Sequence, residues 1–312
     1  MNSNLVLIFS ALLSGMALRR VPQFPGNAHQ ALNAYVIWIS LPALVLTQIP
    51  QLLSTTPLSH EYFVPVSMAW ILFLLSCTFF YFLGHRLRWN KAQTGALMLT
   101  AGLGNTSFVG LPILESLLGK EALPIGILVD QPGTFLVLST LGILVASALS
   151  PLSKGPVTAK SIAKKVLTFP PFISLALAFV LYYLEVPYSD SVQYVLERLA
   201  STLVPLALVA VGFQLRFSRQ VFGAKWRPLA LGLGFKLVLA PLFFVALYIW
   251  LLASTGFITR VTILESAMAP MITASVVAEE FGFDSELTSL MLGLGIPLSI
   301  FTVSLWNQLL VF

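Results

Sequence analysis

The sequence predicts an all-α membrane protein, with ten transmembrane helices arranged as two inverted repeats of five helices each. The first observation is composition, because the 312-residue chain is 57% hydrophobic and only 9% charged, whereas a soluble domain carries about 25% charged residues. The second is a succession of ten apolar runs whose lengths are close to that of a bilayer-spanning helix. The third is a weak internal repeat that relates the two halves of the chain.

The ten expected spans cover most of the chain. The first run is short for a span, and the sixth contains Pro170-Pro171 near its start, which suits a helix N-terminus. No basic region precedes the first run and no small-residue cleavage site follows it, so we expect it to be retained as a span. The approximate bounds of the runs are 3–18, 31–52, 62–84, 93–118, 123–149, 166–186, 192–214, 228–252, 258–281 and 286–311.

Basic residues are concentrated on one side of the expected membrane. The connections after spans one, three, five and seven hold 13 of the 17 lysine and arginine residues. The positive-inside rule therefore places these connections in the cytoplasm and both termini on the non-cytoplasmic side, and we expect the membrane to be the bacterial inner membrane. This role in topology accounts for the net charge of +5, so the sequence predicts no nucleic-acid partner.

A linker divides the sequence almost in half. Residues 150–165 are rich in proline, glycine, serine and lysine, a composition typical of loops, and they separate a first repeat at 1–149 from a second at 166–312. At an offset of 163 residues, Leu-Pro-Ala-Leu-Val at 41–45 falls on Val-Pro-Leu-Ala-Leu at 204–208. Five spans on each side of the linker give the two halves opposite orientations in the membrane.

Span four contains a stretch that an unbroken, lipid-facing helix would not use. From Gly102 to Pro112 it holds three glycines and the consecutive polar residues Asn105, Thr106 and Ser107. Proline cannot donate a helical hydrogen bond, and its ring crowds the preceding turn. We therefore expect the helix to break near the bilayer midplane, where protein or a water-filled cavity must satisfy the backbone. The alternative is a proline-kinked helix whose polar side chains bond to a neighbouring helix.

Span nine has an interruption at the corresponding place in the second repeat. Pro270 lies in the middle of the run among small and polar residues, and at the offset of 163 residues Ser107 falls on it. Two interrupted hydrophobic segments at corresponding positions are the best sequence indicator of a transport site. We therefore expect the broken helices four and nine to cross.

Several segments together carry a family resemblance. The most specific is Gly-Asn-Thr-Ser-Phe-Val-Gly-Leu-Pro at 104–112. The others are Ile-Ser-Leu-Pro-Ala-Leu at 39–44, Asp130, Lys-Leu-Val-Leu-Ala-Pro at 236–241, and the region of Pro270. On these residues the chain resembles, over nearly its whole length, the auxin efflux carrier family, a branch of the superfamily that includes the bile acid:sodium symporters.

The resemblance implies ten spans, with a scaffold domain of spans one, two, six and seven and a transport domain of spans three to five and eight to ten. It implies that the protein carries organic anions such as malate, malonate or auxin-like carboxylates across a lipid membrane. It also implies a homodimer formed through the scaffold spans, and the smooth apolar character of spans one and two suits such packing. The alternative is a sodium-coupled symporter of larger, amphipathic anions of the bile-acid type.

The broken helices define the expected anion site. Helix N-termini present free N–H groups and a partial positive charge, which favour an anion where the second halves of the two helices begin. A charge near the bilayer centre is costly and needs a partner or a function, and Lys236 lies deep in span eight. The expected substrate-binding residues are Asn105, Thr106, Ser107, Pro112, Pro270, Thr273 and Lys236.

Two carboxylates within the spans are the candidates for binding a coupling cation. Glu265 lies about one helical turn before Pro270, and Asp130 begins the helix-breaking sequence Asp-Gln-Pro-Gly at 130–133. Burial favours the protonated form of a carboxyl group, so either could bind a proton. The alternative is a structural ion pair of Glu265 or Asp130 with Lys236.

Sodium is the other candidate for the coupling ion. In the bile acid symporter relatives, a glutamate at the place of Glu265 helps to bind sodium. The resemblance therefore implies a sodium site at Glu265, Asn105 and Ser107, although sodium use does not hold across the auxin carrier branch. We expect no other cofactor.

Other classes of function find little support in the sequence. The three histidines lie outside the expected spans and no nucleophile–base pair is evident, so we expect no enzymatic activity. No glycine-rich phosphate loop followed by lysine occurs, which argues against ATP-driven transport. The single cysteine, Cys77, excludes a disulfide framework. A channel should show rings of like residues or a filter loop, whereas this sequence has two unlike broken helices.

Overall fold

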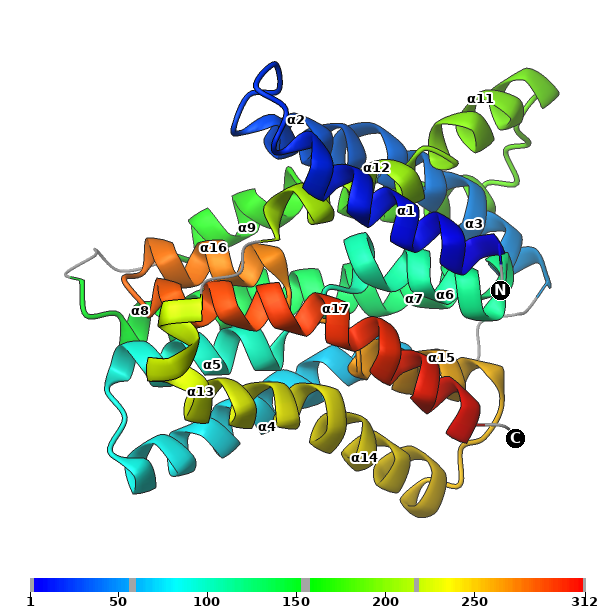
Figure 1. The fold of residues 1–312 in the computed structure, drawn as a ribbon. Coiled ribbons are helices and arrows are strands. Elements are labelled where there is room, and N and C mark those ends of the chain that lie inside the picture. The colour runs from blue at the N-terminus through cyan, green and yellow to red at the C-terminus, as the bar shows by residue number, and fades with distance from the viewer. Residues whose placement is uncertain (1–2, 56–59, 153–157, 216–218, 311–312) are drawn as a thin grey trace. The chain divides into compact units, whose positions relative to one another are not determined.

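The computed structural model describes residues 3–55, 60–152, 158–215 and 219–310, and every regular element in these ranges is a helix (Figure 1). Six described segments are long and apolar enough to cross a membrane, namely Ala28–Ser54, Phe63–Leu87, Lys120–Leu149, Asp190–Gln214, Lys225–Leu251 and Ser285–Leu309. Shorter apolar helices are Val6–Leu18, Thr106–Leu118 and Pro170–Tyr183. The all-helical prediction is confirmed, whereas the ten-span inverted repeat stays a prediction.

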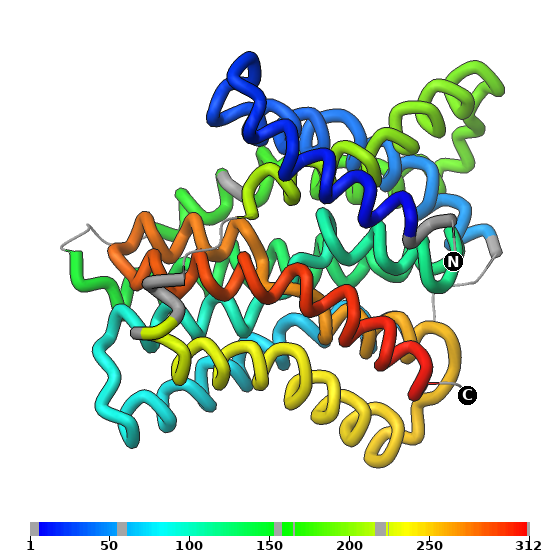
Figure 2. The backbone as a smooth tube through the Cα atoms, in the orientation of Figure 1, coloured from blue at the N-terminus to red at the C-terminus, as the bar shows by residue number. Residues whose placement is uncertain are grey.

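The chain forms two compact units. The first comprises Met1–His60, Ser107–Ile127 and Lys164–Leu215, and the second comprises Glu61–Thr106, Leu128–Ala163 and Arg216–Phe312. Each unit therefore takes segments from both halves of the sequence, as the backbone trace shows by its colours (Figure 2). The assignment of a scaffold role and a transport role stays a prediction.

Helices from three separate segments build the first unit. Within it α1 packs along α12, and α3 packs against α10 and α11. The elements are α1 (Ser3–Leu18), α2 (Ala28–Tyr35), the π-helix η1 (Val36–Ser40), α3 (Leu41–Thr55), most of the π-helix η3 (Thr106–Gly110), α6 (Leu111–Leu118), the 3-10 helix η4 (Lys120–Ala122), α10 (Pro170–Tyr183), α11 (Asp190–Ala200) and α12 (Leu203–Gln214).

The contact between α1 and α12 depends on two glycines. A Cβ atom at Gly15 would lie 2.1 Å from the carbonyl oxygen of Val209, and one at Gly212 would lie 2.1 Å from that of Leu12. Real side chains do not approach a backbone atom so closely. The two backbones can therefore meet only because both positions lack a side chain, as is common where helices pack in membranes.

The second unit contains the remaining helices. In it α4 and α5 lie side by side, and α16 and α17 both contact α5. The elements are the 3-10 helix η2 (His60–Tyr62), α4 (Phe63–Leu87), α5 (Lys91–Gly102), the π-helices η5 (Asp130–Phe135) and η6 (Leu138–Gly142), α8 (Ile143–Leu149), α13 (Arg219–Gly234), the π-helix η7 (Phe235–Leu239), α14 (Ala240–Phe244), the π-helix η8 (Val245–Leu251), α15 (Phe257–Ser266), α16 (Ile272–Glu280) and α17 (Ser285–Leu309). Helices α7 (Leu123–Val129) and α9 (Ala159–Leu167) each contain a boundary between the two units.

Prolines set the irregular turns within the long helices. The π-helical segments η1, η3 and η7 each end two residues before a proline, which is Pro42, Pro112 or Pro241. A proline ring crowds the carbonyl group four residues earlier and cannot donate to it, which favours the wider hydrogen-bond spacing of a π turn. The carbonyl group that Pro241 cannot bond belongs to Leu237, and it accepts instead from Trp306 Nε1 at 3.0 Å.

Side-chain caps begin several helices at the expected places. Asn90 accepts from the N–H of Gln93 at 2.8 Å at the start of α5. Asp284 accepts from the N–H of Leu287 at 3.0 Å at the start of α17. Such caps satisfy donors that the first turn of a helix leaves without partners. They fix where each apolar helix begins, and so fix which residues reach the interior of the unit.

Helix α9 is an element that the composition of the sequence concealed. The interval 150–165 reads as a linker, yet Ala159–Leu167 is helical. Proline and glycine occur only in its first part, at 151–156, so the loop composition of the whole interval came from residues that precede the helix.

Candidate functional site

The second unit contains the crossing of two interrupted helical segments. Helix α5 ends at Gly102 before helical turns resume at Thr106, and α15 ends at Ser266 before α16 begins at Ile272. Both predicted interruptions are therefore present. They meet through an antiparallel bridge between Gly104 and Pro270.

Backbone hydrogen bonds hold the two interruptions together. The N–H of Asn105 donates to the carbonyl oxygen of Ala269 at 2.7 Å, and the N–H of Met271 donates to that of Leu103 at 3.0 Å. Backbone groups that leave a helix inside a membrane protein must be satisfied by protein or water. Here each interruption supplies partners for the other, which makes the crossing a fixed structural feature.

Glycine is required where the crossing approaches a charged side chain. A Cβ atom at Gly104 would lie 3.2 Å from Lys236 Nζ and 3.5 Å from the carbonyl oxygen of Glu265. On the other side of the bridge, a Cβ atom at Gly295 of α17 would lie 2.6 Å from Cδ of Pro270. The glycines thus leave room for an ammonium group beside one interruption and for the proline ring at the other.

Lys236 is completely buried and binds the end of a helix. Its Nζ donates to the carbonyl oxygen of Ser266 at 3.1 Å. Ser266 is the last residue of α15, and the last carbonyl groups of a helix have no intrahelical donor and carry partial negative charge. The lysine therefore satisfies a backbone group that the interruption leaves free.

Asp130 is buried beside the first interruption. One carboxylate oxygen accepts from Thr106 Oγ1 at 2.5 Å, and the other accepts from Gln131 Nε2 at 2.6 Å. Thr106 is the first residue after the interruption of α5. Charge-assisted hydrogen bonds of this kind are short and stronger than neutral ones, so Asp130 fixes the position at which helical turns resume.

Glu265 is the exception among the buried charged groups. It has no exposed surface, and neither of its carboxylate oxygens has a hydrogen-bond partner in the described part of the chain. Lys236 and Asp130 are the charged groups that act on it electrostatically. A buried polar group without a partner is rare, and its presence points to a functional role and not only a structural one.

The ion pair of Lys236 with Glu265 or Asp130, which was the structural alternative, is not formed within 4.0 Å in the described residues. The ion pairs within 4.0 Å there join Lys225 to Asp284 and to Glu286. Lys236 bonds a backbone carbonyl group instead. A purely structural role for Glu265 would require a direct ion pair with Lys236, and the described residues do not form it.

The remaining predicted residues are placed differently. Ser107 and Pro112 belong to the first unit, where Pro112 is buried near the start of α6. Thr273, the second residue of α16, is exposed and is not among the residues that bond at the crossing. In the described ranges, no group of three or more His, Cys, Asp or Glu side chains could hold a metal ion.

Two participants at the crossing were assigned no role from the sequence. Gln131 donates to Asp130, and Ser266 supplies a backbone carbonyl group to Lys236. The position of Gln131 next to Asp130 in a buried proline-containing segment was a usable signal. The role of Ser266 could not be read from sequence, because it depends on the backbone and not on the side chain.

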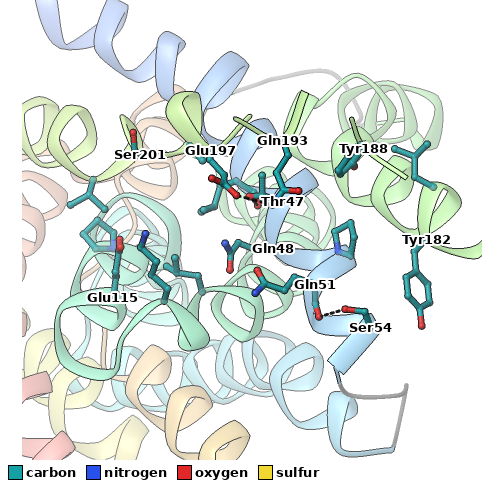
Figure 3. Close-up of a pocket in the computed structure, with 18 of the residues that line it drawn as sticks. Thr47, Gln48, Gln51, Ser54, Glu115, Tyr182, Tyr188, Gln193, Glu197 and Ser201 are labelled. Carbon is teal, nitrogen blue, oxygen red and sulfur yellow. Dashed lines mark hydrogen bonds between the residues drawn. The ribbon is translucent and has the colours of Figure 1, made fainter. Parts of the chain in front are cut away.

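The first unit contains a cavity of about 1010 Å³ that the sequence reading missed. Side chains from α3, α6, α11 and the connection between α10 and α11 surround it (Figure 3). Its wall on α3 carries Thr47, Gln48, Gln51 and Ser54. These four polar residues recur at helical spacing in an otherwise apolar span, which is a signal that the sequence offered.

A proline shapes one wall of this cavity. Pro50 lies within α3 and cannot donate to the carbonyl group of Leu46. The Tyr188 hydroxyl donates to that carbonyl oxygen at 3.2 Å. Burial raises the pKa of the Tyr188 phenol, so its hydroxyl keeps the proton that this bond needs.

Comparison with known proteins identifies relatives along nearly the whole chain. The family model described as "Membrane transport protein" matches residues 2–307. An "Uncharacterized transporter" of Methanothermobacter thermautotrophicus is 28% identical over 279 residues, which are 89% of this chain and 88% of that protein. A second "Uncharacterized transporter", from Methanocaldococcus jannaschii, is 26% identical over 287 residues, which are 89% of each chain.

A third relative carries a more specific name. A "Putative malonate transporter" of Rhizobium meliloti is 28% identical over 228 residues, which are 68% of this chain and 66% of that protein. The family match, the apolar helices and the interrupted crossing agree with one another. The chain belongs to the membrane transport protein family, the family of auxin efflux carrier-like transporters.

Proposed function

We propose that the protein is a secondary active transporter of small organic anions, such as malonate, malate or auxin-like carboxylates, which it moves by alternating access. The observation that carries the proposal is the crossing of two interrupted helices beside two buried side chains, Lys236 and Glu265, of which Glu265 has no hydrogen-bond partner in the described residues. A cationic and an anionic side chain at one crossing offer one place for an anion and one for a cation. Discontinuous helices with such groups form the sites of secondary transporters.

The anion half of the site consists of Lys236, the Asn105 amide and the start of α16. Helix α16 begins at Ile272, directly after the bridge, and its first N–H groups carry the positive end of the helix dipole. The Lys236 ammonium group has three donors, one of which bonds Ser266. A small carboxylate bound there accepts hydrogen bonds from both elements, with Thr273 at its exposed edge. The name of the Rhizobium meliloti relative fits this class of substrate.

The cation half of the site is the Glu265 carboxylate, with Asp130 as the second candidate. Glu265 has no hydrogen-bond donor in the described residues, so a sodium ion or a proton supplies the positive charge that the carboxylate lacks. The carbonyl groups at the end of α15 and the Asn105 side chain are suitable oxygen ligands for sodium. Asp130 already accepts two hydrogen bonds, which makes it the less available of the two.

The proposed topology has ten spans in two inverted repeats, with the carrier in the bacterial inner membrane and both termini on the non-cytoplasmic side. The positive charge of the connections supports this orientation. We further propose that spans one, two, six and seven form a scaffold and a homodimer, while spans three to five and eight to ten move the substrate. A monomeric mass in both mild detergent and nanodiscs would count against the dimer.

The test of the proposed function is uptake of radiolabelled malonate and malate by proteoliposomes that contain the purified protein. We expect uptake that saturates and that exchanges with substrate loaded inside the vesicles. Lys236→Gln should abolish uptake, whereas Lys91→Gln, at the exposed start of α5, should leave it unchanged. Single-channel currents without saturation would show a channel instead, and competition by bile acids but not by malonate would show a carrier of larger anions.

A further inference from the structure

The cavity of the first unit is acidic. The charged residues of its lining are Glu115, Glu185, Glu197 and Lys120, so three carboxylates face one ammonium group. Electrostatic attraction links Lys120 to Glu115, which leaves Glu185 and Glu197 without a cation in the lining. An anionic substrate of the kind proposed for the crossing would be repelled here, whereas the charge of the lining suits a cation.

Five of the six hydroxyl groups that line the cavity donate their protons to backbone carbonyl oxygens. Thr47, Ser54 and Ser201 donate to the carbonyl oxygens three residues earlier along the chain, at 2.7–2.9 Å. Tyr182 and Tyr188 donate to carbonyl oxygens of α3, at 2.9 Å and 3.2 Å. A hydroxyl group has one proton and two lone pairs, so all five can only accept from a ligand.

The lining also contains the amide groups of Gln48, Gln51 and Gln193, each of which can both donate and accept hydrogen bonds. Gln193 donates through Nε2 to a carboxylate oxygen of Glu197 at 3.0 Å, and this bond also holds the carboxylate in position on α11 (Figure 3). Its own amide oxygen is a further acceptor. The lining thus combines five hydroxyl oxygens that can only accept with an excess of negative charge, and the cavity volume lies at the upper end of the range for small-molecule sites.

We propose that this cavity binds a small ligand that carries a protonated amine. An ammonium group brings three donors and one positive charge, which matches a lining of hydroxyl oxygens and carboxylates. Glu197, held by Gln193, binds the ammonium group, and the hydroxyl oxygens of Thr47 and Ser201 complete its hydrogen bonds. The site differs in charge from the anion site at the crossing, and it requires neither that site nor transport activity.

The test uses 1,4-diaminobutane, with 1,4-butanediol and succinate as its neutral and anionic counterparts of similar length. Isothermal titration of the purified full-length protein should show binding of the diamine that weakens as salt is added, and no binding of the diol at this site. Glu197→Gln should weaken diamine binding at least about ten-fold, because a charge-assisted bond becomes a neutral one. Glu279→Gln, an exposed carboxylate of α16, is the matched control and should leave binding unchanged.

Several results would overturn the amine site. Equal binding of the diamine and the diol by the unmodified protein would show that charge plays no part, whether or not any variant folds. Unchanged diamine affinity in folded Glu197→Gln, or an equal loss in Glu279→Gln, would place the amine elsewhere. Succinate binding that weakens in Glu197→Gln would reverse the assigned charge of the ligand.

Helix α9 is amphipathic, and this feature supports a second, independent inference. Ala159, Ile162, Ala163 and Val166 recur at the spacing of one helical face, and Lys160, Ser161 and Lys164 lie on the opposite face. No other helix in the described ranges packs extensively against α9, and Leu167 is 68% exposed. Ala159 and Ala163 are exposed while Ile162 and Val166 are half-buried, so the described chain covers the apolar face only in part.

We infer that α9 lies in the membrane interface, with its apolar face in the bilayer and its lysines on anionic lipid headgroups. The apolar segments that end at Leu149 and begin at Pro170 hold the helix close to the membrane surface. The interval 150–169 contains four lysines and no acidic residue, so its charge complements an anionic surface. Basic amphipathic helices bind such surfaces through apolar burial and headgroup attraction together.

The test places an environment-sensitive fluorophore at Ala163→Cys or at Ser161→Cys in a Cys77→Ser background. In proteoliposomes of phosphatidylcholine with phosphatidylglycerol, lipid-borne nitroxide should quench the label at 163, and aqueous iodide should quench the label at 161. Replacing Lys160 and Lys164 by glutamine should reduce nitroxide quenching toward its value in phosphatidylcholine alone. Each lost lysine should lower the equilibrium constant for binding of the helix to the anionic surface about five-fold. Replacement of both by arginine keeps the charge and should preserve quenching.

The proposed contact of α9 with lipid is contradicted if the labels at 163 and 161 are quenched to the same extent. Equal exposure to iodide would show a helix away from the bilayer. Equal protection from both quenchers would show a helix covered by protein. Nitroxide quenching of the 163 label that is the same with and without phosphatidylglycerol would show that the lysines do not bind headgroups.

Discussion

Lys236 Nζ lies 3.1 Å from the carbonyl oxygen of Ser266, so a fully buried cation is bound to the last residue of an interrupted helix. This partner is a backbone group and not a carboxylate, so no direct ion pair to Lys236 is formed in the described residues. Two of its three N–H donors remain beyond this bond. The arrangement suits a group that holds a substrate anion and releases it again.

Substitution of Lys236 by methionine should remove substrate binding. The methionine side chain has similar length but no charge, so a bound carboxylate loses its cation and the carbonyl oxygen of Ser266 loses its donor. The unsatisfied carbonyl group should also cost about 1–3 kcal/mol of stability. Thermal-shift titration with malonate measures both effects, and Lys91→Met is the control that should resemble the unmodified protein. A malonate-dependent shift retained in Lys236→Met would show that the lysine does not hold the anion.

Gly104→Ala should impair transport while the fold is kept. The added methyl group would lie 3.2 Å from Lys236 Nζ, which forces the ammonium group away from its position at the crossing. Gly234→Ala, where no neighbouring atom lies within 4 Å of the new methyl group, is the matched control. We expect a clear fall in malonate uptake in the first variant and none in the second, as measured in proteoliposomes. Equal uptake in both would show that this close contact is unimportant.

Thr106→Val should destabilise the crossing. The change keeps the shape of the side chain but removes its hydrogen bond to Asp130, and a bond to a charged group is worth about 1.5–3 kcal/mol. Thr106→Ser keeps the hydroxyl group and should retain most of the stability. Thermal unfolding in mild detergent compares the two, and Thr78→Val on the exposed face of α4 serves as the control. A Thr106→Val protein as stable as this control would contradict the assigned bond.

Asn105→Ala should weaken substrate binding without unfolding the protein. The backbone N–H of Asn105 bonds the carbonyl oxygen of Ala269, and alanine preserves that bond. Only the side-chain amide is lost, which removes donors for the anion. Calorimetric titration with malonate should show a higher Kd at an unchanged melting temperature. Normal binding would place the substrate away from this side chain.

Gly15→Ala should destabilise the first unit. Its methyl group would lie 2.1 Å from the carbonyl oxygen of Val209, so α1 and α12 must separate. Inserting a methyl group into a packed interior costs about 1–3 kcal/mol. Gly26→Ala, which meets no atom within 4 Å, should change the melting temperature little. Equal melting temperatures for the two variants would show that the α1–α12 contact is not this close in solution.

The broad fold could be predicted from the sequence because apolar run length and composition reflect the bilayer directly. The interruption before Thr106 and the one at Pro270 were also predictable, since glycine and proline alter the backbone locally. Helix α9 was missed because the proline and glycine of the preceding loop dominated the composition of the interval. The cavity of the first unit was missed because it depends on residues from separate segments that come together only in three dimensions.

Part of the candidate site could also be predicted from the sequence. Buried Lys236, Asp130 and Glu265 were recognisable, because a charge inside an apolar span is unusual. Their partners were not, since the sequence does not show that Lys236 bonds a backbone carbonyl group while Glu265 has no partner in the described residues. Those two facts favour a site for transport over a structural ion pair.

The most direct test of the central claim measures how malonate uptake by the Glu265→Gln protein depends on sodium and on pH. Glutamine keeps the shape of the side chain but can neither hold sodium as a carboxylate nor exchange a proton at neutral pH. The unmodified protein should require a sodium or a proton gradient for concentrative uptake. The folded variant should lose that dependence, while Asp130→Asn shows whether the second carboxylate contributes. Uptake by Glu265→Gln with the same dependence on sodium and pH as the unmodified protein would contradict the assignment of Glu265 to the coupling cation.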